Sequence, residues 1–452
     1  MMGERVVSQD RLFYEFCLED RIPADHLLRK IEAVLDLSWL RGELAPYYSH
    51  TGCPSLDPEL LIRMLIVGYS YSIRSERRLC QEVEMNLAYR WFCGLGLEDK
   101  VPHHSSFSVN RHGRFRDSDI LRTIFEETVC GCMKAGLVGG EGFAVDASVI
   151  EADASRFARI KGAEVDWSEQ QLARRAVREF VEALESENPP INPDQKPKAM
   201  SPSDPCAAWT VRGRHKVMFG YSLNYLMDME HSVVMDVEAT PTRISMEVEA
   251  TETMIDRVKE RFGLDPDRTA GDVAYGTGAL LGKLVERDIT PHIPVWDRTE
   301  VAADGIVPRA DFTYHSDRDL YVCPGGKELK TSGTVHDGTT LKYIAKRSDC
   351  GQCPLKPQCT TGRERRVQRD VNQEARDYTQ GLMETDAYWQ SALDRKKIER
   401  LFGEAKRHLC MTRLRLRGLT GASDEFLLTA TVQNVKRLVK HVIRPPPEPA
   451  IA

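Results

Sequence analysis

Apolar residues recur at steps of three and four through most of the first 135 residues. Four segments carry this pattern, and they are His26–Leu40, Asp57–Ser70, Ser75–Leu95 and Ser118–Gly136. This spacing places apolar side chains on one face of a helix, and Asp57 before Pro58 is typical of a helix start. The pattern predicts an all-helical N-terminal domain.

After Gly139 the apolar positions change to runs that favour strands. Candidate strands lie at 143–150, 216–228 and 232–241. A helix-like run at 245–263 then leads to a short apolar approach that ends at Asp272, followed by a second helix-like run and the strand candidate 290–295. This order predicts a mixed α/β sheet with flanking helices. The proline-rich stretch 188–205 predicts an exposed loop.

Short β-like pieces, glycines and cysteines fill the next region, before a long helix pattern returns near Thr385. We therefore predict four parts. They are a helical N-terminal domain (1–135), the first part of a core (136–296), a β-rich insertion that contains cysteines (297–375), and the C-terminal helical part of the core (376–445).

The composition excludes some classes of protein. The absence of a long apolar segment and of a leader-like start predicts a cytoplasmic protein without a membrane span. The formal net charge of −6 means that the molecule as a whole does not attract nucleic acid. Any nucleic-acid binding must come from local basic surfaces. The 12 cysteines, without a secretion signal, argue against a disulfide framework.

Three carboxylates lie where a site could form. Asp146 lies within the first strand and Asp272 at the end of a later one, and ligand-binding groups gather at strand ends in such sheets. The third is Glu399, on the C-terminal helix, where it borders an apolar stripe together with Arg395 and Lys406. Five apolar residues form this stripe, which should pack on the sheet: Ile398, Leu401, Phe402, Ala405 and Leu409. Five charged residues should point away: Lys396, Lys397, Arg400, Glu404 and Arg407.

Each of these acids also has an ordinary interpretation. Asp272 could be a turn former or a helix cap. Glu399 could form a surface ion pair with Arg395, four residues earlier, worth about 0.3 kcal/mol.

The motifs around these acids resemble a known family. "RKKIERLFGEAK" contains R-x3-E-x6-K as Arg395, Glu399 and Lys406, which resembles the signature around the last acid of DDE insertion-sequence transposases with an RNase H-like core. "AVDASVIEA" and "AGDVAYGTG" resemble the first and second acid motifs, and the N-terminal region is similar to the helical N-terminal domain of that group. The fuller signature has a tyrosine where this chain has Ala392, and Tyr388 lies one turn earlier.

The resemblance implies a bacterial, nucleoid-associated DNA transposase, acting as an endonuclease and strand transferase. Asp146, Asp272 and Glu399 would be catalytic and would hold Mg²⁺ or Mn²⁺, because hard cations prefer carboxylate oxygens. Arg395 and Lys406 would contact DNA. The partners would be double-stranded DNA, as terminal inverted repeats and target, and further copies of the chain, because two ends must be joined. A catalytically silent DNA-binding protein and a plain nuclease are the alternatives.

Two basic segments add candidates for DNA binding. They are 361–369 and 406–419, and the second contains Arg413 and Arg415. Lysines and arginines that neutralise phosphates supply most sequence-independent affinity for DNA, although such segments are also typical of solvated surface.

Four cysteines of the insertion could form a tetrahedral zinc site. They are Cys323, Cys350, Cys353 and Cys359, in "YVCPGG" and "SDCGQCPLKPQCT". The alternative is a set of reduced thiols in a small β-subdomain. A zinc ion here would brace the insertion and would take no part in DNA cleavage.

Overall fold

The computed structural model describes residues 16–49, 51, 55–161, 169–184, 198–212, 216–295 and 306–443. The chain divides into two compact units. The first comprises 1–135, 405–411 and 427–452, and the second comprises 136–404 and 412–426. Most of the proline-rich stretch predicted to be a loop lies outside the described residues. No helix among the described residues is both long enough and apolar enough to cross a membrane.

The first unit is helical, as the sequence predicts. Its helices are α1 (Leu18–Arg21), α2 (Leu27–Glu32), α3 (Leu40–Leu44), η1 (Ala45–Tyr47), α4 (Pro58–Ser70), α5 (Glu76–Met85), α6 (Leu87–Phe92), α7 (Ser105–Arg111), α8 (Arg114–Asp117) and α9 (Ile120–Lys134). Asp57 caps α4 by accepting a hydrogen bond from the amide of Glu59 at 3.0 Å. The predicted helix 75–95 is instead two helices, because Asn86 ends α5 and caps α6.

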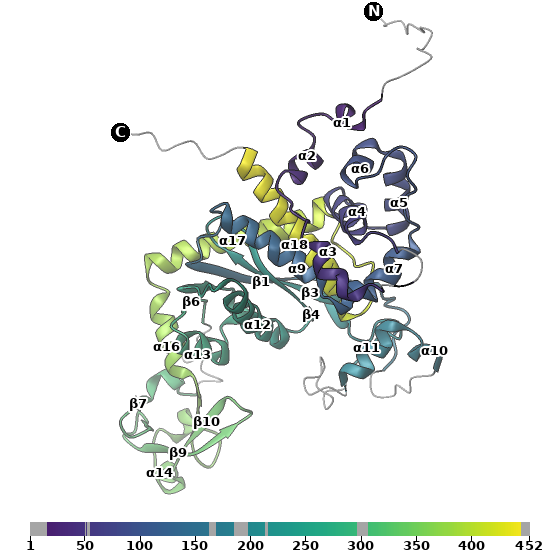
Figure 1. Ribbon diagram of the computed structural model, residues 1–452. Coiled ribbons are helices and arrows are strands. Elements are labelled where there is room, and N and C mark those ends of the chain that lie inside the picture. The colour runs from purple at the N-terminus through teal and green to yellow at the C-terminus, as the bar shows by residue number, and fades with distance from the viewer. Residues whose placement is uncertain are drawn as a thin grey trace, which may run out of the picture. The chain divides into compact units, whose positions relative to one another are not determined.

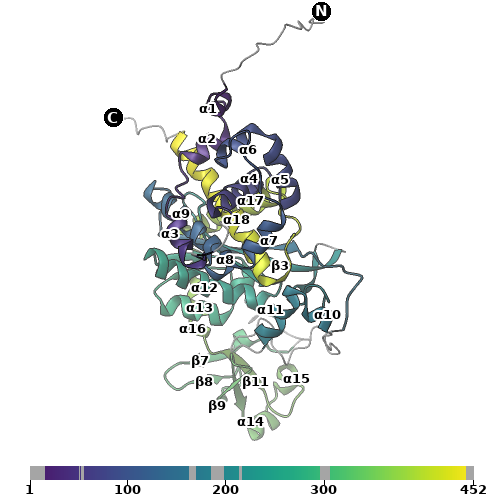
Figure 2. The same ribbon diagram turned by 45° about the vertical axis from the view of Figure 1, so that its right-hand side comes forward.

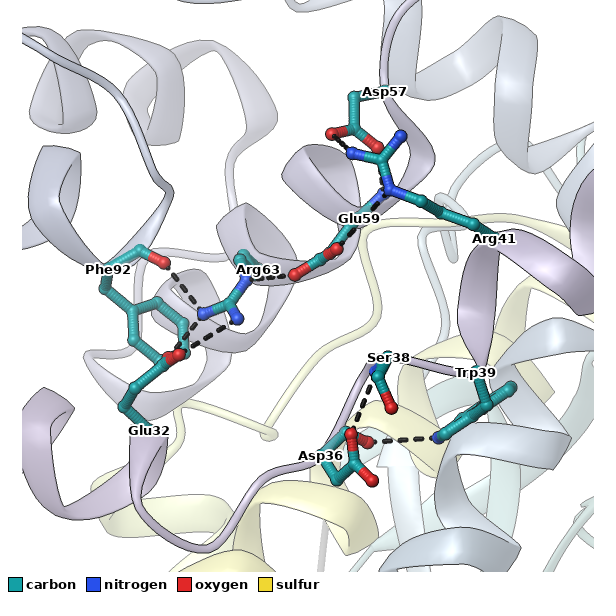
Figure 3. Close-up of polar contacts among 9 residues, drawn as sticks. All are labelled: Glu32, Asp36, Ser38, Trp39, Arg41, Asp57, Glu59, Arg63 and Phe92. Carbon is teal, nitrogen blue, oxygen red and sulfur yellow. Dashed lines mark hydrogen bonds and ion pairs between the residues drawn. The ribbon is translucent and has the colours of Figure 1, made fainter.

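One charged residue lies inside the apolar run of α4. Arg63 forms ion pairs with Glu59, at 2.8 Å, and with Glu32 (Figure 3). Its Nη1 also donates to the carbonyl oxygen of Phe92 at 3.0 Å. The guanidinium is therefore satisfied by hydrogen bonds although its side chain is only 15% exposed.

The second unit is built on a six-stranded mixed sheet (Figure 1). Its strands are β1 (Gly142–Glu151), β2 (Ala208–Arg212), β3 (Lys216–Asp228), β4 (Val234–Pro241), β5 (Arg268–Ala270) and β6 (Thr290–His292). The order is β2-β3-β1-β5-β6, with β4 also paired to β3. β1 is antiparallel to β3 and parallel to β5. This confirms the predicted mixed α/β class, whereas β2 was not predicted.

Further helices begin in the second unit, and the last two continue into the first unit. They are α10 (Glu169–Leu172), α11 (Arg175–Leu184), α12 (Ile244–Phe262), η2 (Val273–Tyr275), α13 (Gly278–Glu286), α16 (Gln373–Leu382), α17 (Asp386–His408) and α18 (Gly418–Ile443). All five residues of the predicted apolar stripe of α17 are buried, and Phe402 packs on the sheet as predicted, because its ring stacks on that of Tyr225 with centroids 5.0 Å apart. Lys397 does not point away, because its Nζ donates to the carbonyl oxygen of Met229 at 2.7 Å.

A second sheet lies between β6 and α16 in the sequence (Figure 2). It contains β7 (Thr313–His315), β8 (Leu320–Val322), β9 (Glu328–His336), β10 (Thr340–Ala345) and β11 (Arg366–Asp370), all antiparallel in the order β11-β10-β9-β8-β7. Three short helices accompany it: η3 (Arg309–Asp311), α14 (Arg347–Gly351) and α15 (Lys356–Cys359). Its own small core includes Phe312, Leu329 and Tyr343.

Candidate active site

Asp146 lies in the middle of β1, opposite Tyr225 of β3. One carboxylate oxygen accepts a hydrogen bond from the amide of Ala147 at 2.8 Å, and the other accepts one from Nη1 of Arg395 at 3.3 Å. The side chain is 18% exposed. Burial raises the pKa of Asp146 to about 6, against the lowering by these two donors. The charges of Asp272 and Glu399 raise this pKa further, so both lie within electrostatic reach.

The pairing of β1 with β5 explains why Asp272 is near Asp146. The parallel register aligns Phe143 with Thr269 and Ala144 with Ala270. If this register is continued by two residues, Asp272 is level with Asp146, and neighbouring strands are about 4.8 Å apart. Asp272 also caps η2, because one oxygen accepts a hydrogen bond from the amide of Ala274 at 2.8 Å. The helix-cap interpretation is thus confirmed, and the charge of the same residue acts on Asp146.

The third predicted carboxylate, Glu399, lies on α17. Glu399 is exposed, and its charge acts on Asp146. In the described part of the chain no ion pair joins it to Arg395, because Arg395 pairs with Asp146 instead. The interpretation of Glu399 as the surface ion-pair partner of Arg395 is therefore wrong.

The family signature has a tyrosine where this chain has Ala392, and Tyr388 is the nearest tyrosine before that position on α17. It lies seven residues before Arg395, which is nearly two helical turns, so the two side chains share a face of α17. Its side chain is 5% exposed, and its ring lies 5.8 Å from that of His292. Burial raises the pKa of Tyr388, and the charge of Arg395 opposes this rise. A tyrosine therefore lies near Arg395 although position 392 is alanine.

Tyr275 is a site residue that sequence reasoning missed. It ends η2, three residues after Asp272, and is 2% exposed. Burial raises its pKa, and so do the charges of Asp146, Glu247 and Asp272. Its hydroxyl has no hydrogen-bond partner among the described residues. The only signal in the sequence is an aromatic residue inside the motif "AGDVAYGTG".

The donor set of this site suits a hard divalent cation. The charges of Asp272 and Glu399 raise the pKa of Asp146, and a bound cation would counter this repulsion between carboxylates. The hydroxyl of Tyr275, which has no hydrogen-bond partner among the described residues, is affected by the charges of Asp146 and Asp272. Within the described residues, however, no group of three or more His, Cys, Asp or Glu side chains is gathered closely enough to hold a metal ion. One oxygen of Asp146 accepts a hydrogen bond from Arg395, so this oxygen is occupied by the guanidinium.

The remaining predicted DNA-binding residues lie on α17 and just after it. Lys406 is half-buried and lies seven residues after Glu399. Arg413 forms an ion pair with Asp153 at 3.0 Å, and Arg415 is exposed. The backbone around Arg413 runs beside the end of β1, because the amide of Leu414 donates to the carbonyl oxygen of Glu151 at 2.7 Å. A role of these residues in DNA binding stays a prediction.

The fold brings the four predicted cysteines into one region of the insertion, but among the described residues they do not form a group close enough to hold a metal ion. All are free and half-buried. A Cβ atom added to Gly325 would lie 3.6 Å from the sulfurs of both Cys323 and Cys353. Burial raises the pKa of Cys359, and the charges of the other three raise it further, against the effect of Arg365. Backbone amides donate to two of the sulfurs, that of Lys327 to Cys323 at 3.3 Å and that of Arg365 to Cys350 at 3.5 Å.

Comparisons with known proteins identify two domains. Residues 16–113 match the transposase domain DUF772, and residues 322–439 match a transposase DDE domain. The chain therefore carries the domains of a DDE-type transposase, which confirms the family resemblance and indicates a DNA transposase. The DDE match contains Glu399, Arg395 and the four cysteines, whereas Asp146 and Asp272 precede it.

One solved structure is also similar. It is the cryo-EM structure of a piggyBac transposase synaptic complex with hairpin DNA, which matches 92% of this chain and 73% of that chain with 9% identity and a TM-score of 0.31. This likeness is too weak to support an argument about the fold. No curated protein matches the chain.

Proposed function

We propose that this protein is the transposase of a bacterial insertion sequence, which cuts DNA at the ends of the element and joins them to new DNA. The observation that carries the proposal is the parallel pairing of β1 with β5, whose register, if continued by two residues, aligns Asp146 with Asp272, together with the effect of the charges of Asp272 and Glu399 on the pKa of Asp146. These three acids lie in a chain that contains two transposase domains. The mixed sheet with Asp146 on a central strand also supports an RNase H-like core.

DNA cleavage and strand transfer both displace an oxygen at phosphorus, and negative charge builds on the attacking and leaving oxygens. Asp146, Asp272 and Glu399 would hold Mg²⁺ or Mn²⁺, which would stabilise that charge and lower the pKa of the attacking water. Arg395 would exchange its ion pair with Asp146 for a DNA phosphate, which a guanidinium can bind through two parallel hydrogen bonds. Lys406 would add a point charge on the same helix.

Double-stranded DNA is the proposed partner, both as the terminal repeats of the element and as target. Arg413 and Arg415 would contact it beside the end of β1. The transposase would act as a homo-oligomer on DNA of the bacterial nucleoid, because two ends must be held in one complex before they are joined.

A plasmid assay tests this function. Supercoiled plasmid that carries the element and its flanks is incubated with the protein and Mg²⁺, and nicked, linear and joined products are separated on a gel. Joined products support a transposase. Cutting without joined products indicates a plain nuclease, and a shift in DNA mobility without cutting indicates a silent DNA-binding protein.

For the insertion, we propose that Cys323, Cys350, Cys353 and Cys359 bind a structural Zn²⁺. Four thiolates would complete a tetrahedral ligand set once their side chains close on the ion, and the amides that donate to Cys323 and Cys350 would stabilise those two sulfurs as thiolates. The zinc would fix α14 and α15 to the end of β8, far in sequence from the three carboxylates.

Replacing Tyr275 by phenylalanine tests whether its hydroxyl orients the site. The hydroxyl lies among the carboxylate charges with no partner among the described residues, so in the DNA-bound protein it can donate to a carboxylate or a water. We expect cleavage to fall about tenfold, or about 1.4 kcal/mol. The melting temperature should stay the same or rise, because an unsatisfied buried hydroxyl is removed.

The matched control is Tyr314→Phe, which removes a hydroxyl that donates to Asp319 at 2.9 Å in the second sheet. This variant should cleave like the wild type. If Tyr275→Phe also cleaves like the wild type, the hydroxyl has no role in positioning and Tyr275 only fills space.

A further inference from the structure

A cavity of about 650 Å³ lies beside the second sheet, in the second unit. Its walls come from β11, from α16 and from the turn after η2 that contains Gly276. None of the three carboxylates of the candidate active site lines it. The cavity is thus a separate feature of the same unit, and nothing in the proposed chemistry explains it.

The cavity is strongly basic in a protein whose net charge is −6. Five arginines line it, and they are Arg309, Arg365, Arg366, Arg369 and Arg376. Among the described residues only two acidic side chains share the lining, and both carboxylates already accept hydrogen bonds. Asp370 accepts one from the amide of Asn372 at 2.8 Å, and Asp377 accepts one from the side chain of Gln373 at 2.7 Å. The lining therefore favours an anion.

Two of the five arginines, Arg365 and Arg369, are held in place by contacts within the second sheet and its neighbouring loops. Arg365 donates to the carbonyl oxygens of Cys359 and Val307, both at 2.9 Å. Arg369 is 8% exposed and lies over the ring of Tyr314, 3.8 Å from its centroid. Arg309 is half-buried, and Arg366 is 61% exposed and paired with half-buried Glu364 at 2.8 Å. Arg309 and Arg366 are therefore the residues that can turn toward a ligand at little cost to the fold.

The kind of anion follows from the rest of the lining. β11 is an edge strand of its sheet, so one side of its backbone has no strand partner in the described sheet, and its amides can donate to an oxygen-rich anion. In the described part of the chain no aromatic ring lines the cavity, so this part of the wall offers bases no surface on which to stack. Guanidinium groups and backbone amides are the donors that typically bind DNA phosphates.

The cavity is tied to the active site through one hydrogen bond. Nη1 of Arg376 donates to the carbonyl oxygen of Gly276 at 3.0 Å, and Gly276 lies four residues after Asp272. A Cβ atom at Gly276 would lie 2.4 Å from the carbonyl oxygen of Pro294, so this turn is tightly fixed. A DNA strand that crosses the three carboxylates would therefore pass close to the arginines.

We propose that this cavity binds a backbone phosphate of the DNA strand next to the cleaved bond. The inference rests on the proposed transposase function, and it assigns to the insertion a direct role in holding DNA. Arg309 and Arg366 supply the charge, β11 supplies backbone donors, and Arg376 connects the bound phosphate to the turn that follows Asp272.

The test compares the full-length wild type with the double variant Arg309→Gln and Arg366→Gln. Binding of a short fluorescent duplex is measured by anisotropy over a range of salt concentrations, with Ca²⁺ in place of Mg²⁺. Loss of one phosphate contact should reduce the slope of log K against log salt by about 0.9. Affinity at low salt should fall about tenfold, the effect of one charge-assisted contact.

The matched control is Arg318→Gln, which removes an exposed arginine of the same sheet, paired with Glu328 at 3.0 Å and outside the cavity. It should keep the wild-type slope. If the double variant behaves like Arg318→Gln while the wild type cuts plasmid DNA, the cavity has no role in DNA binding and the transposase function stands. If the wild type neither binds the duplex nor cuts the plasmid, the proposed function itself fails.

Discussion

Replacing Asp272 by asparagine should abolish DNA cleavage and leave DNA binding unchanged. The fold should be kept, because the side-chain oxygen of asparagine can still accept the hydrogen bond from the amide of Ala274 that caps η2. The negative charge level with Asp146 is lost, and with it a ligand for the divalent cation. We expect cleavage to fall at least about a thousandfold, which is about 4 kcal/mol of lost transition-state stabilisation. Plasmid cleavage and duplex binding are measured on the same preparation.

The matched control for this variant is Asp265→Asn. Asp265 lies shortly before β5 in the same unit, where it forms surface ion pairs with Lys259 and Arg287. Since exposed pairs contribute little to stability, this variant should cleave like the wild type. If Asp272→Asn retained most of its cleavage activity, the three-carboxylate site would be wrong. If it lost solubility and binding together, Asp272 would serve the fold through its cap.

Local patterns were enough to predict the elements that carry the site. The strand around Asp146 follows from its run of β-prone residues, and the helix around Glu399 follows from apolar residues spaced three and four apart. Both patterns can be seen directly in the sequence. β2 was missed because five residues beside a proline-rich stretch give too short a pattern. The predicted helix 75–95 was broken at Asn86, since a capping side chain outweighed the continuing apolar period.

Side-chain partners far apart in the sequence could not be predicted. The sequence shows that Arg395 and Glu399 are four residues apart, yet Arg395 pairs with Asp146, 249 residues away, because α17 packs across β3 beside β1. Tyr275 became a site residue only when the β1–β5 register placed η2 next to Asp146. The arginine-lined cavity likewise needs β11, α16 and the turn at Gly276 in one place.

Replacing Cys353 by serine should remove zinc from the protein and loosen the insertion. Wild-type protein should contain about one zinc ion per chain by elemental analysis, because four thiolates complete a tetrahedral site. A serine hydroxyl is a poor ligand, and zinc binding energy, about 10–16 kcal/mol in zinc-finger peptides, is also folding energy. The second sheet has only a small core around Leu329 and Tyr343, so proteolysis after β8 should become much faster.

The matched control is Cys410→Ser, since Cys410 is an exposed free cysteine of the first unit and lies outside the insertion. It should keep the full zinc content and the wild-type proteolysis pattern. Wild-type protein from zinc-supplemented cells that contains no zinc above background would contradict the proposal, and the four residues would then be reduced thiols. Zinc bound equally by wild type and Cys353→Ser would place the metal elsewhere. Because the DNA-binding cavity is lined by β11, loss of zinc should also weaken duplex binding if the metal braces the sheet that carries Arg366.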